Sequence, residues 1–282
     1  MKINFEKRLV LGIVTLLLVN VLEFRSGKLL AAVQLVLGLA VFMPKLIDTN
    51  ISNKINLYRP ILKWLYLFAL GWGIYSEWYY VPNHLFLFFF LSVLVLTSED
   101  EYHIKDNLRW IFVIIMGFAA IHKLLNPVFL SGDYIGYRLA SGNFFKPIWM
   151  SGILPEISEN LTQNAAKVSE FKSQDPLLGQ MIMLRMDFIL FSWLVKTFSY
   201  VVIAMEFLLV LLFTLFSKTR AAMATLLIFV ASIGFAVPEF EFASTLLFMG
   251  LVVCPDNFNV LKKLYLLSFL VYVVLSVWYN HF

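Results

Sequence analysis

The sequence has 282 residues, of which 61% are hydrophobic and only 14% are charged, and its mean hydropathy is +0.82. A soluble globular protein of this length needs far more polar surface, so the composition excludes that class. The net charge of +4 does not indicate a nucleic-acid partner, because the basic residues lie in short stretches between apolar runs. The single cysteine, Cys254, excludes an internal disulfide and a cysteine-based metal or redox site, so redox chemistry would require a bound cofactor.

Apolar runs follow one another along the chain. A helix needs about 20 mostly apolar residues to cross the hydrocarbon core of a membrane. The runs cover residues 9–24, 29–43, 61–78, 85–97, 108–125, 187–216, 221–237, 242–254 and 264–279. The first run has a basic start and resembles a cleaved signal peptide, but the second run follows almost at once, which favours an uncleaved helix. We therefore predict an all-α polytopic integral membrane protein with about nine transmembrane helices, within a range of eight to ten.

Residues 126–180 interrupt this pattern. The segment contains four prolines, several glycines and the polar stretch 156–175, and it has no apolar window of spanning length. We expect one transmembrane domain over residues 1–282, in which 126–180 forms an extracytoplasmic, re-entrant or amphipathic insertion between the fifth and sixth helices.

The distribution of basic residues predicts the orientation of the chain, because short cytoplasmic loops carry most lysines and arginines. With the amino terminus in the cytoplasm, the short outer loops hold only Arg25 and Lys28. The cytoplasmic segments then hold Lys2, Lys7, Arg8, Lys45, Lys54, Arg59, Lys63, Lys105, Arg109, Lys218, Arg220, Lys262 and Lys263. This partition predicts an extracytoplasmic carboxyl terminus and places Lys123 and segment 126–180 on the outer side.

Lys123 lies at the end of the fifth apolar run, in the string FAAIHKLLNPVFLSG (118–132). One interpretation is that its long side chain simply reaches the membrane interface. The other rests on the small residues before it, Gly117, Ala119 and Ala120, which let a neighbouring helix approach and exclude lipid. Loss of hydration disfavours a charged amine, and a neutral amine can act as a general base.

Glu206 lies in the middle of the run 187–216, far from other charges. We expect its carboxyl to face the protein interior, where it either pairs with a cation or stays protonated. A packed acid that fixes helix register is the structural alternative. Lys123 is a partner only if both residues lie at the same depth, and helical rise can place a mid-span and an end-of-span residue about 10 Å apart.

Other ionisable residues lie near the expected ends of spans. Adjacent residues on a helix point about 100° apart, which argues against a dyad of His122 with Lys123. The sixth span is flanked by Arg185, Asp187 and Lys196, and two of these are expected to form an ion pair at the membrane interface. Glu23 and Glu77 are expected at membrane interfaces. Glu239 and Glu241 lie in an outer turn, where they either face the mouth of a cavity or are solvated.

The string AAIHKL (119–124), followed by Asn126, Pro127, Phe129 and Gly132, resembles the lysine motif of the vitamin K-dependent gamma-carboxylase family. It is more similar still to the bacterial membrane proteins called HTTM (horizontally transferred transmembrane) domains. The resemblance implies a bacterial cytoplasmic (inner) membrane location and a quinone as the cofactor or substrate. It also implies that Lys123 is the base that deprotonates this molecule on the outer side.

The sequence differs from that pattern by a spacer one residue longer and by Ala120 at a position where glycine is common. Protein carboxylation is not expected, because no large soluble region follows the spans to dock a polypeptide substrate. The small four-helix DoxX-type membrane proteins have a comparable glycine and lysine pattern and are a further relative to consider.

Two functional hypotheses follow. In the first, the protein is an enzyme, a carboxylase-like protein or quinone-linked oxidoreductase, with Lys123 and Glu206 in the catalytic site and no metal. In the second, it is a non-catalytic membrane subunit that docks a membrane or exported protein of a secretion or maturation complex through segment 126–180. A transporter that uses Lys123 and Glu206 as a proton relay is a weaker third option.

Overall fold

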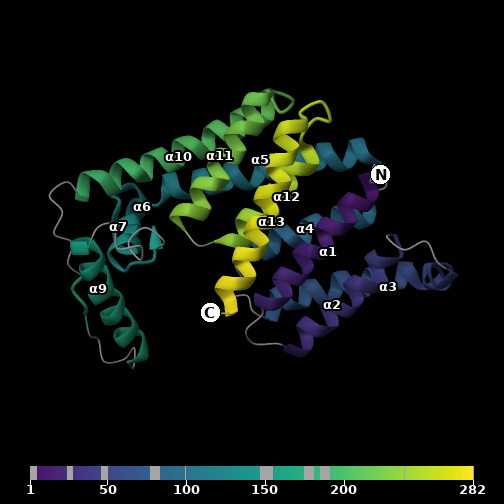
Figure 1. Ribbon diagram of the computed structural model, residues 1–282, viewed down its shortest axis with the longest axis horizontal. Helices are drawn as coiled ribbons and strands as arrows, with labels where there is room; N and C mark the ends of the chain where they lie inside the picture. Colours follow the sequence, from purple (N-terminus) through teal and green to yellow (C-terminus); the bar gives the residue numbers. More distant parts are fainter. Residues whose placement is uncertain are drawn as a thin grey trace. The chain divides into compact units, whose positions relative to one another are not determined.

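A computed structural model describes residues 5–23, 28–45, 50–76, 83–98, 100–146, 155–174, 181–184, 191–237 and 239–281. The regular elements in these residues are all helices (Figure 1). The chain groups into two compact units. Unit 1 comprises residues 1–112 and 239–282, and unit 2 comprises residues 113–238. Each unit is described by itself below.

Unit 1 is a helical bundle. It is built from α1 (Phe5–Glu23), α2 (Lys28–Phe42), the short 3-10 helix η1 (Met43–Lys45), α3 (Asn50–Ser76), α4 (Asn83–Thr97), the first part of α5 (Glu101–Leu125), α12 (Phe240–Val253) and α13 (Asn259–His281). The bundle is organised around α12, which packs against α1, α4 and α13. Nearly all of its residues are buried, as expected for a helix that is apolar on every side.

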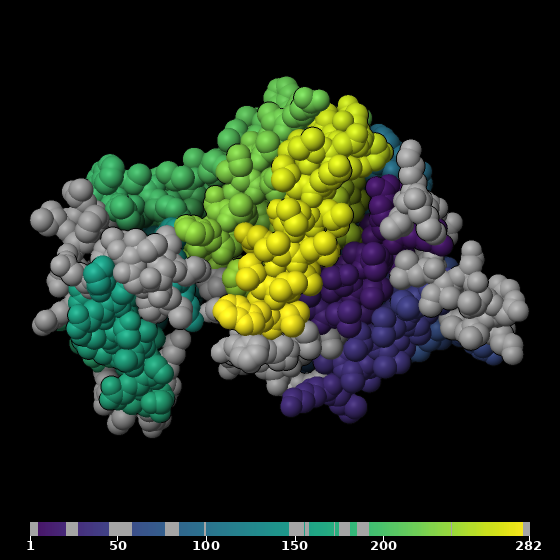
Figure 2. All heavy atoms as spheres, in the orientation of Figure 1, coloured from purple at the N-terminus to yellow at the C-terminus, as the bar shows by residue number. Residues whose placement is uncertain are grey.

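Close helix contacts in unit 1 depend on glycine. A Cβ atom on Gly12 of α1 would lie 1.9 Å from the ring of Phe248 of α12, and one on Gly38 of α2 would lie 2.3 Å from Leu17 of α1. A larger residue at either position would push the helices apart. Figure 2 shows α13, in yellow, spread across the visible face of this unit.

Three helices, or long parts of them, are long and apolar enough to cross a membrane: Glu101–Leu125, Ser192–Leu215 and Asn259–Trp278. Many of their large apolar side chains are exposed, including Ile114, Leu211 and Leu267, as expected for surfaces that face lipid. Four further helices are apolar but shorter. The prediction of an all-helical fold is confirmed for the described residues, and these three helices support a membrane protein, whereas the number of nine spans stays a prediction.

Each predicted apolar run corresponds to a helix, but some helices extend beyond their runs. The helix α3 begins at Asn50, within a stretch expected to be a polar loop, and it continues through Pro60. Neighbouring groups in membrane proteins can satisfy the carbonyl that a helical proline leaves free. The helix α5 begins at Glu101, where the Asp100 carboxylate accepts a hydrogen bond of 3.2 Å from the backbone N–H of His103.

Among the described residues, unit 2 contains the carboxyl-terminal part of α5 and the helices that follow it. These are α6 (Pro127–Leu130), α7 (Asp133–Ala140), α9 (Pro155–Ser173), α10 (Phe191–Leu215) and α11 (Arg220–Ala236). The helices α6 and α7 pack on α10, where Phe129, Ile135, Phe144, Val195 and Ile203 form a buried apolar cluster. Segment 126–180, expected as an insertion, thus contains α6, α7 and α9. Its position relative to a membrane stays a prediction.

Candidate functional site

The structure brings Lys123 and Glu206 together within unit 2. Lys123 is in the last turn of α5, and Glu206 is in the middle of α10. The Lys123 ammonium donates a hydrogen bond to Glu206 Oε1, and the two groups form an ion pair. The two side chains are therefore close enough to pair, which the sequence alone left open.

The small residues before Lys123 allow this approach. A Cβ atom on Gly117 would lie 3.9 Å from Val210 Cγ2 of α10, which is ordinary van der Waals contact, and Ala120 is fully buried. A side chain of α10 therefore lies beside Gly117.

The two partners differ in burial. The Glu206 side chain is 6% exposed, whereas the Lys123 side chain is 25% exposed. The carboxylate oxygen Glu206 Oε2 is buried and has no hydrogen-bond partner within the described protein. A buried carboxylate oxygen without a donor is unfavourable, so this atom is the place where a further hydrogen-bond donor would be most stabilised.

Residues 126–132, which follow Lys123, form a short helical segment beside it that we call the frame. The Asn126 side chain caps α6 by accepting a hydrogen bond of 3.0 Å from the backbone N–H of Val128, and Pro127 occupies the first turn. The Phe129 ring belongs to the apolar cluster, and its centroid is 5.8 Å from Lys123 Nζ. The ring and the carboxylate therefore both stabilise the ammonium group.

Gly132 holds this frame against α10. Its φ is +87°, a conformation that favours glycine, and a Cβ atom would lie 2.8 Å from the backbone nitrogen of Lys196. Sequence reasoning included Gly132 and Asn126 in the motif but did not foresee these roles, since both depend on where α10 passes.

The other candidate residues do not join the pair. His122 and Lys196 are exposed, which agrees with the expectation that His122 forms no dyad with Lys123. Glu239 is exposed at the start of α12. Arg185, Asp187 and Glu77 lie outside the described residues, as does the side chain of Glu23.

Glu241 is buried, at 8% exposure, although the sequence favoured a wet turn or a cavity mouth. Ser276 of α13 donates a hydrogen bond of 2.5 Å to Glu241 Oε1. The hydroxyls of Ser244 and Thr245, one turn later, both donate to the Glu241 backbone carbonyl at 2.9 Å. The missed signal was that Glu241 directly precedes a run of residues that are apolar on every side of the helix.

The pair can exchange a proton and can hold a polar group at the end of a lipid-soluble molecule. Within the described residues, no group of three or more His, Cys, Asp or Glu side chains could hold a metal ion. No family model, no curated protein and no solved structure matches the chain. The relationship to HTTM domains therefore stays a prediction from the lysine motif.

Proposed function

We propose that this chain is a membrane enzyme related to the HTTM domains, in which Lys123 and Glu206 together take a proton from a lipid-soluble molecule that carries a hydroxyl group. The observation that carries the proposal is the Lys123–Glu206 pair with its unpartnered oxygen, Oε2. A hydroxyl supplies the hydrogen that this oxygen lacks. A quinone-like molecule in its hydroquinone form has such a hydroxyl on an apolar ring, which agrees with the resemblance.

The pair gains one proton in the proposed step. The hydroxyl O–H bond breaks, its electron pair stays on the substrate oxygen, and the proton moves to the pair. Lys123 acts as the base once its own proton has moved to Glu206 along the hydrogen bond between the two groups.

Exposed apolar residues around Lys123 support entry from lipid rather than from water. On α5, Phe118 is 71% exposed and Leu125 is 76% exposed, with Ile121 and Leu124 also exposed. A molecule dissolved in the bilayer could reach Lys123 across this surface without crossing a polar layer.

We further propose the full topology, with nine spans in a bacterial cytoplasmic membrane, a cytoplasmic amino terminus and an extracytoplasmic carboxyl terminus. The nine helices that coincide with the apolar runs support it. The basic residues Lys105, Lys218 and Lys262 lie at the starts or turns of helices that this orientation puts in the cytoplasm. Lys123 then lies near the outer surface.

Oxidation of menadiol, a simple naphthohydroquinone, tests the proposal in lipid nanodiscs. Oxygen takes up the hydroquinone's two electrons and two protons to give the quinone and hydrogen peroxide, and deprotonation speeds this reaction. We expect wild-type protein to raise oxygen uptake above that of empty nanodiscs, and Lys123→Ala, Lys123→Arg and Glu206→Gln to remove the increase. The arginine variant fails because arginine stays protonated.

Lys196→Ala is the matched control, because it removes an exposed lysine of α10. Its oxygen uptake should equal that of the wild type. Full activity in Lys123→Arg, or no increase with the wild-type protein, would reject the proposed proton transfer.

A non-catalytic membrane subunit is the second candidate, in which segment 126–180 docks a membrane or exported protein. The polar helix α9 favours it, because Thr162, Gln163 and Lys167 are exposed while Leu161 and Val168 are buried. Deleting residues 156–175 should then abolish co-purification of the partner, whereas Lys123→Ala should leave it intact. The reverse pattern would reject docking through this helix.

A further inference from the structure

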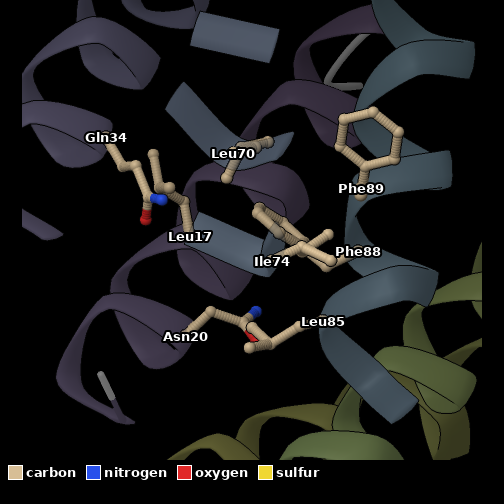
Figure 3. A pocket seen from close by; sticks show the side chains of 8 residues that line it. All are labelled: Leu17, Asn20, Gln34, Leu70, Ile74, Leu85, Phe88 and Phe89. Carbon is tan, nitrogen blue, oxygen red and sulfur yellow. The ribbon is translucent and has the colours of Figure 1, made fainter. Parts of the chain in front are cut away.

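A small cavity lies inside unit 1, among α1, α2, α3 and α4 (Figure 3). Its walls are leucine, isoleucine and phenylalanine side chains together with two amides, Asn20 of α1 and Gln34 of α2. It has room for about one water molecule. None of these residues belongs to the Lys123–Glu206 site.

The two amides are fixed in orientation by bonds to the backbone. Asn20 Nδ2 donates to the carbonyl of Leu16 at 2.7 Å, and Gln34 Nε2 donates to the carbonyl of Ala69 at 2.9 Å. Rotating either amide by a half turn would place its oxygen against a carbonyl oxygen, so the nitrogen and oxygen positions are determined.

Both amide oxygens are consequently left without a donor. Asn20 is 3% exposed and Gln34 is fully buried, and neither Asn20 Oδ1 nor Gln34 Oε1 has a hydrogen-bond partner within the described protein. The apolar side chains that complete the walls cannot donate a hydrogen bond. The cavity lining therefore contains two acceptors without a donor, and a ligand that supplies hydrogens satisfies them.

The size and the lining of the cavity determine which kind of ligand it can hold. A metal cation would need several oxygen ligands and would be desolvated beside leucine and phenylalanine side chains, which is costly. Water is small, neutral and donates two hydrogen bonds, and buried water typically satisfies polar groups of this kind.

Several of the lining residues lie close to the ends of their helices. Asn20 is in the last turn of α1, Ile74 is in the last turn of α3, and Leu85 is in the first turn of α4. These helix ends lie on one side of the cavity within unit 1, because consecutive helices of the bundle run in opposite directions.

We infer that this cavity is an internal hydration site, in which exchangeable water donates hydrogen bonds to Asn20 Oδ1 and Gln34 Oε1. The water satisfies two acceptors that the helix packing leaves open. It also places a polar, hydrated contact between α1 and α2.

Water-edited solid-state NMR of the protein in lipid bilayers tests the site directly. Magnetisation from water should reach the side-chain amides of Asn20 and Gln34 several-fold faster than the backbone of Leu16, which is fully buried. Transfer to both amides as slow as transfer to Leu16 would show a dry cavity and overturn the inference.

A pair of matched variants locates the water. Ile74→Phe adds volume at the cavity wall and should slow transfer to both amides, whereas Ile61→Phe makes the same change at an exposed position of α3. Equal transfer in the two variants would place the water elsewhere. Replacing NaCl by choline chloride should leave both amide signals unmoved, and a shift of both would identify a sodium site and reject water.

Discussion

Two carboxylates in this protein pair with lysines, and their surroundings differ. The Glu206 side chain in unit 2 is 6% exposed and pairs with Lys123. The Asp256 side chain in unit 1 is 69% exposed and pairs with Lys262. Its Oδ2 atom lies 3.7 Å from Lys105 Nζ. Asp256 thus has two nearby cations and water, whereas Glu206 has one cation and a buried oxygen without a donor.

This difference shows that an ion pair between a lysine and a carboxylate does not by itself indicate a functional site. The Asp256 cluster is solvated and links the turn between α12 and α13 to α5, so we expect a modest structural role. The Glu206 pair lies in apolar surroundings, where an unpaired charge is costly and a bound donor is strongly favoured.

The two ion pairs should differ most in the free energy of unfolding that is lost when the lysine of each pair is replaced by alanine. Lys123→Ala leaves Glu206 buried without its cation and should lower the free energy of unfolding by about 3 kcal/mol. Lys262→Ala should lower it by less than about 1 kcal/mol, because water and Lys105 remain beside Asp256. Unfolding in mixed detergent micelles measures both.

The double variant Lys123→Met with Glu206→Met controls for lost packing. It should recover most of the stability, because it removes the buried charge as well as its partner. Equal losses in the two single variants would contradict the contrast between the pairs.

The free energy of unfolding should be next most sensitive to changes in the frame, residues 126–132. Gly132→Ala combines an unfavourable φ with a clash against the α10 backbone and should cost about 2 kcal/mol. Gly117→Ala is the control, since its Cβ atom meets Val210 at ordinary contact distance and should change stability by less than about 1 kcal/mol. If both variants unfold alike, Gly132 does not hold α7 against α10.

The pH dependence of the free energy of unfolding tests the contribution of Asp256 and its two lysines. The hydrogen bond from Lys262, followed by the charge of Lys105, holds the pKa of Asp256 below its ordinary value, although partial burial acts in the opposite direction. A lowered folded-state pKa gives stability that is present above the unfolded value of about 3.9 and is lost as the pH falls through the folded value.

We expect this contribution to be under about 1 kcal/mol because Asp256 is largely exposed. Asp256→Asn should therefore be less stable than the wild type near neutral pH and approach it at acid pH, as thermal unfolding curves would show. A difference that does not shrink with falling pH would argue against the ion pair as its source.

The smallest effect should be seen at Cys254, the single cysteine, which is fully buried two residues before Asp256. N-ethylmaleimide should label it slowly in the native protein. Asp256→Asn should raise the labelling rate a few-fold by loosening the turn, whereas Glu206→Gln should leave it unchanged. The same increase in both variants would show that labelling follows overall stability and not the turn.

Hydropathy was enough to locate the apolar helices, because each apolar run, from 9–24 to 264–279, corresponds to a helix. Helix boundaries in polar stretches were harder to predict. The helix α3 continues back to Asn50 through Pro60, and composition alone describes that stretch as a loop.

The partner of Glu206 could not be predicted from the sequence. Pairing depends on how α5 and α10 cross, and small residues such as Gly117 show only that some helix can approach. The role of Gly132 likewise depends on the path of α10, and the burial of Glu241 depends on the helices that surround α12.

Infrared difference spectroscopy of the protein in nanodiscs, with and without menadiol under anaerobic conditions, tests the central claim most directly. Menadiol should change the C=O stretch of a carboxyl group in the wild-type protein, and that change should be absent in Glu206→Gln and present in Asp256→Asn. No carboxyl change in the wild type, or the same change in Glu206→Gln, would contradict the claim that the buried pair takes a proton from a lipid-soluble molecule.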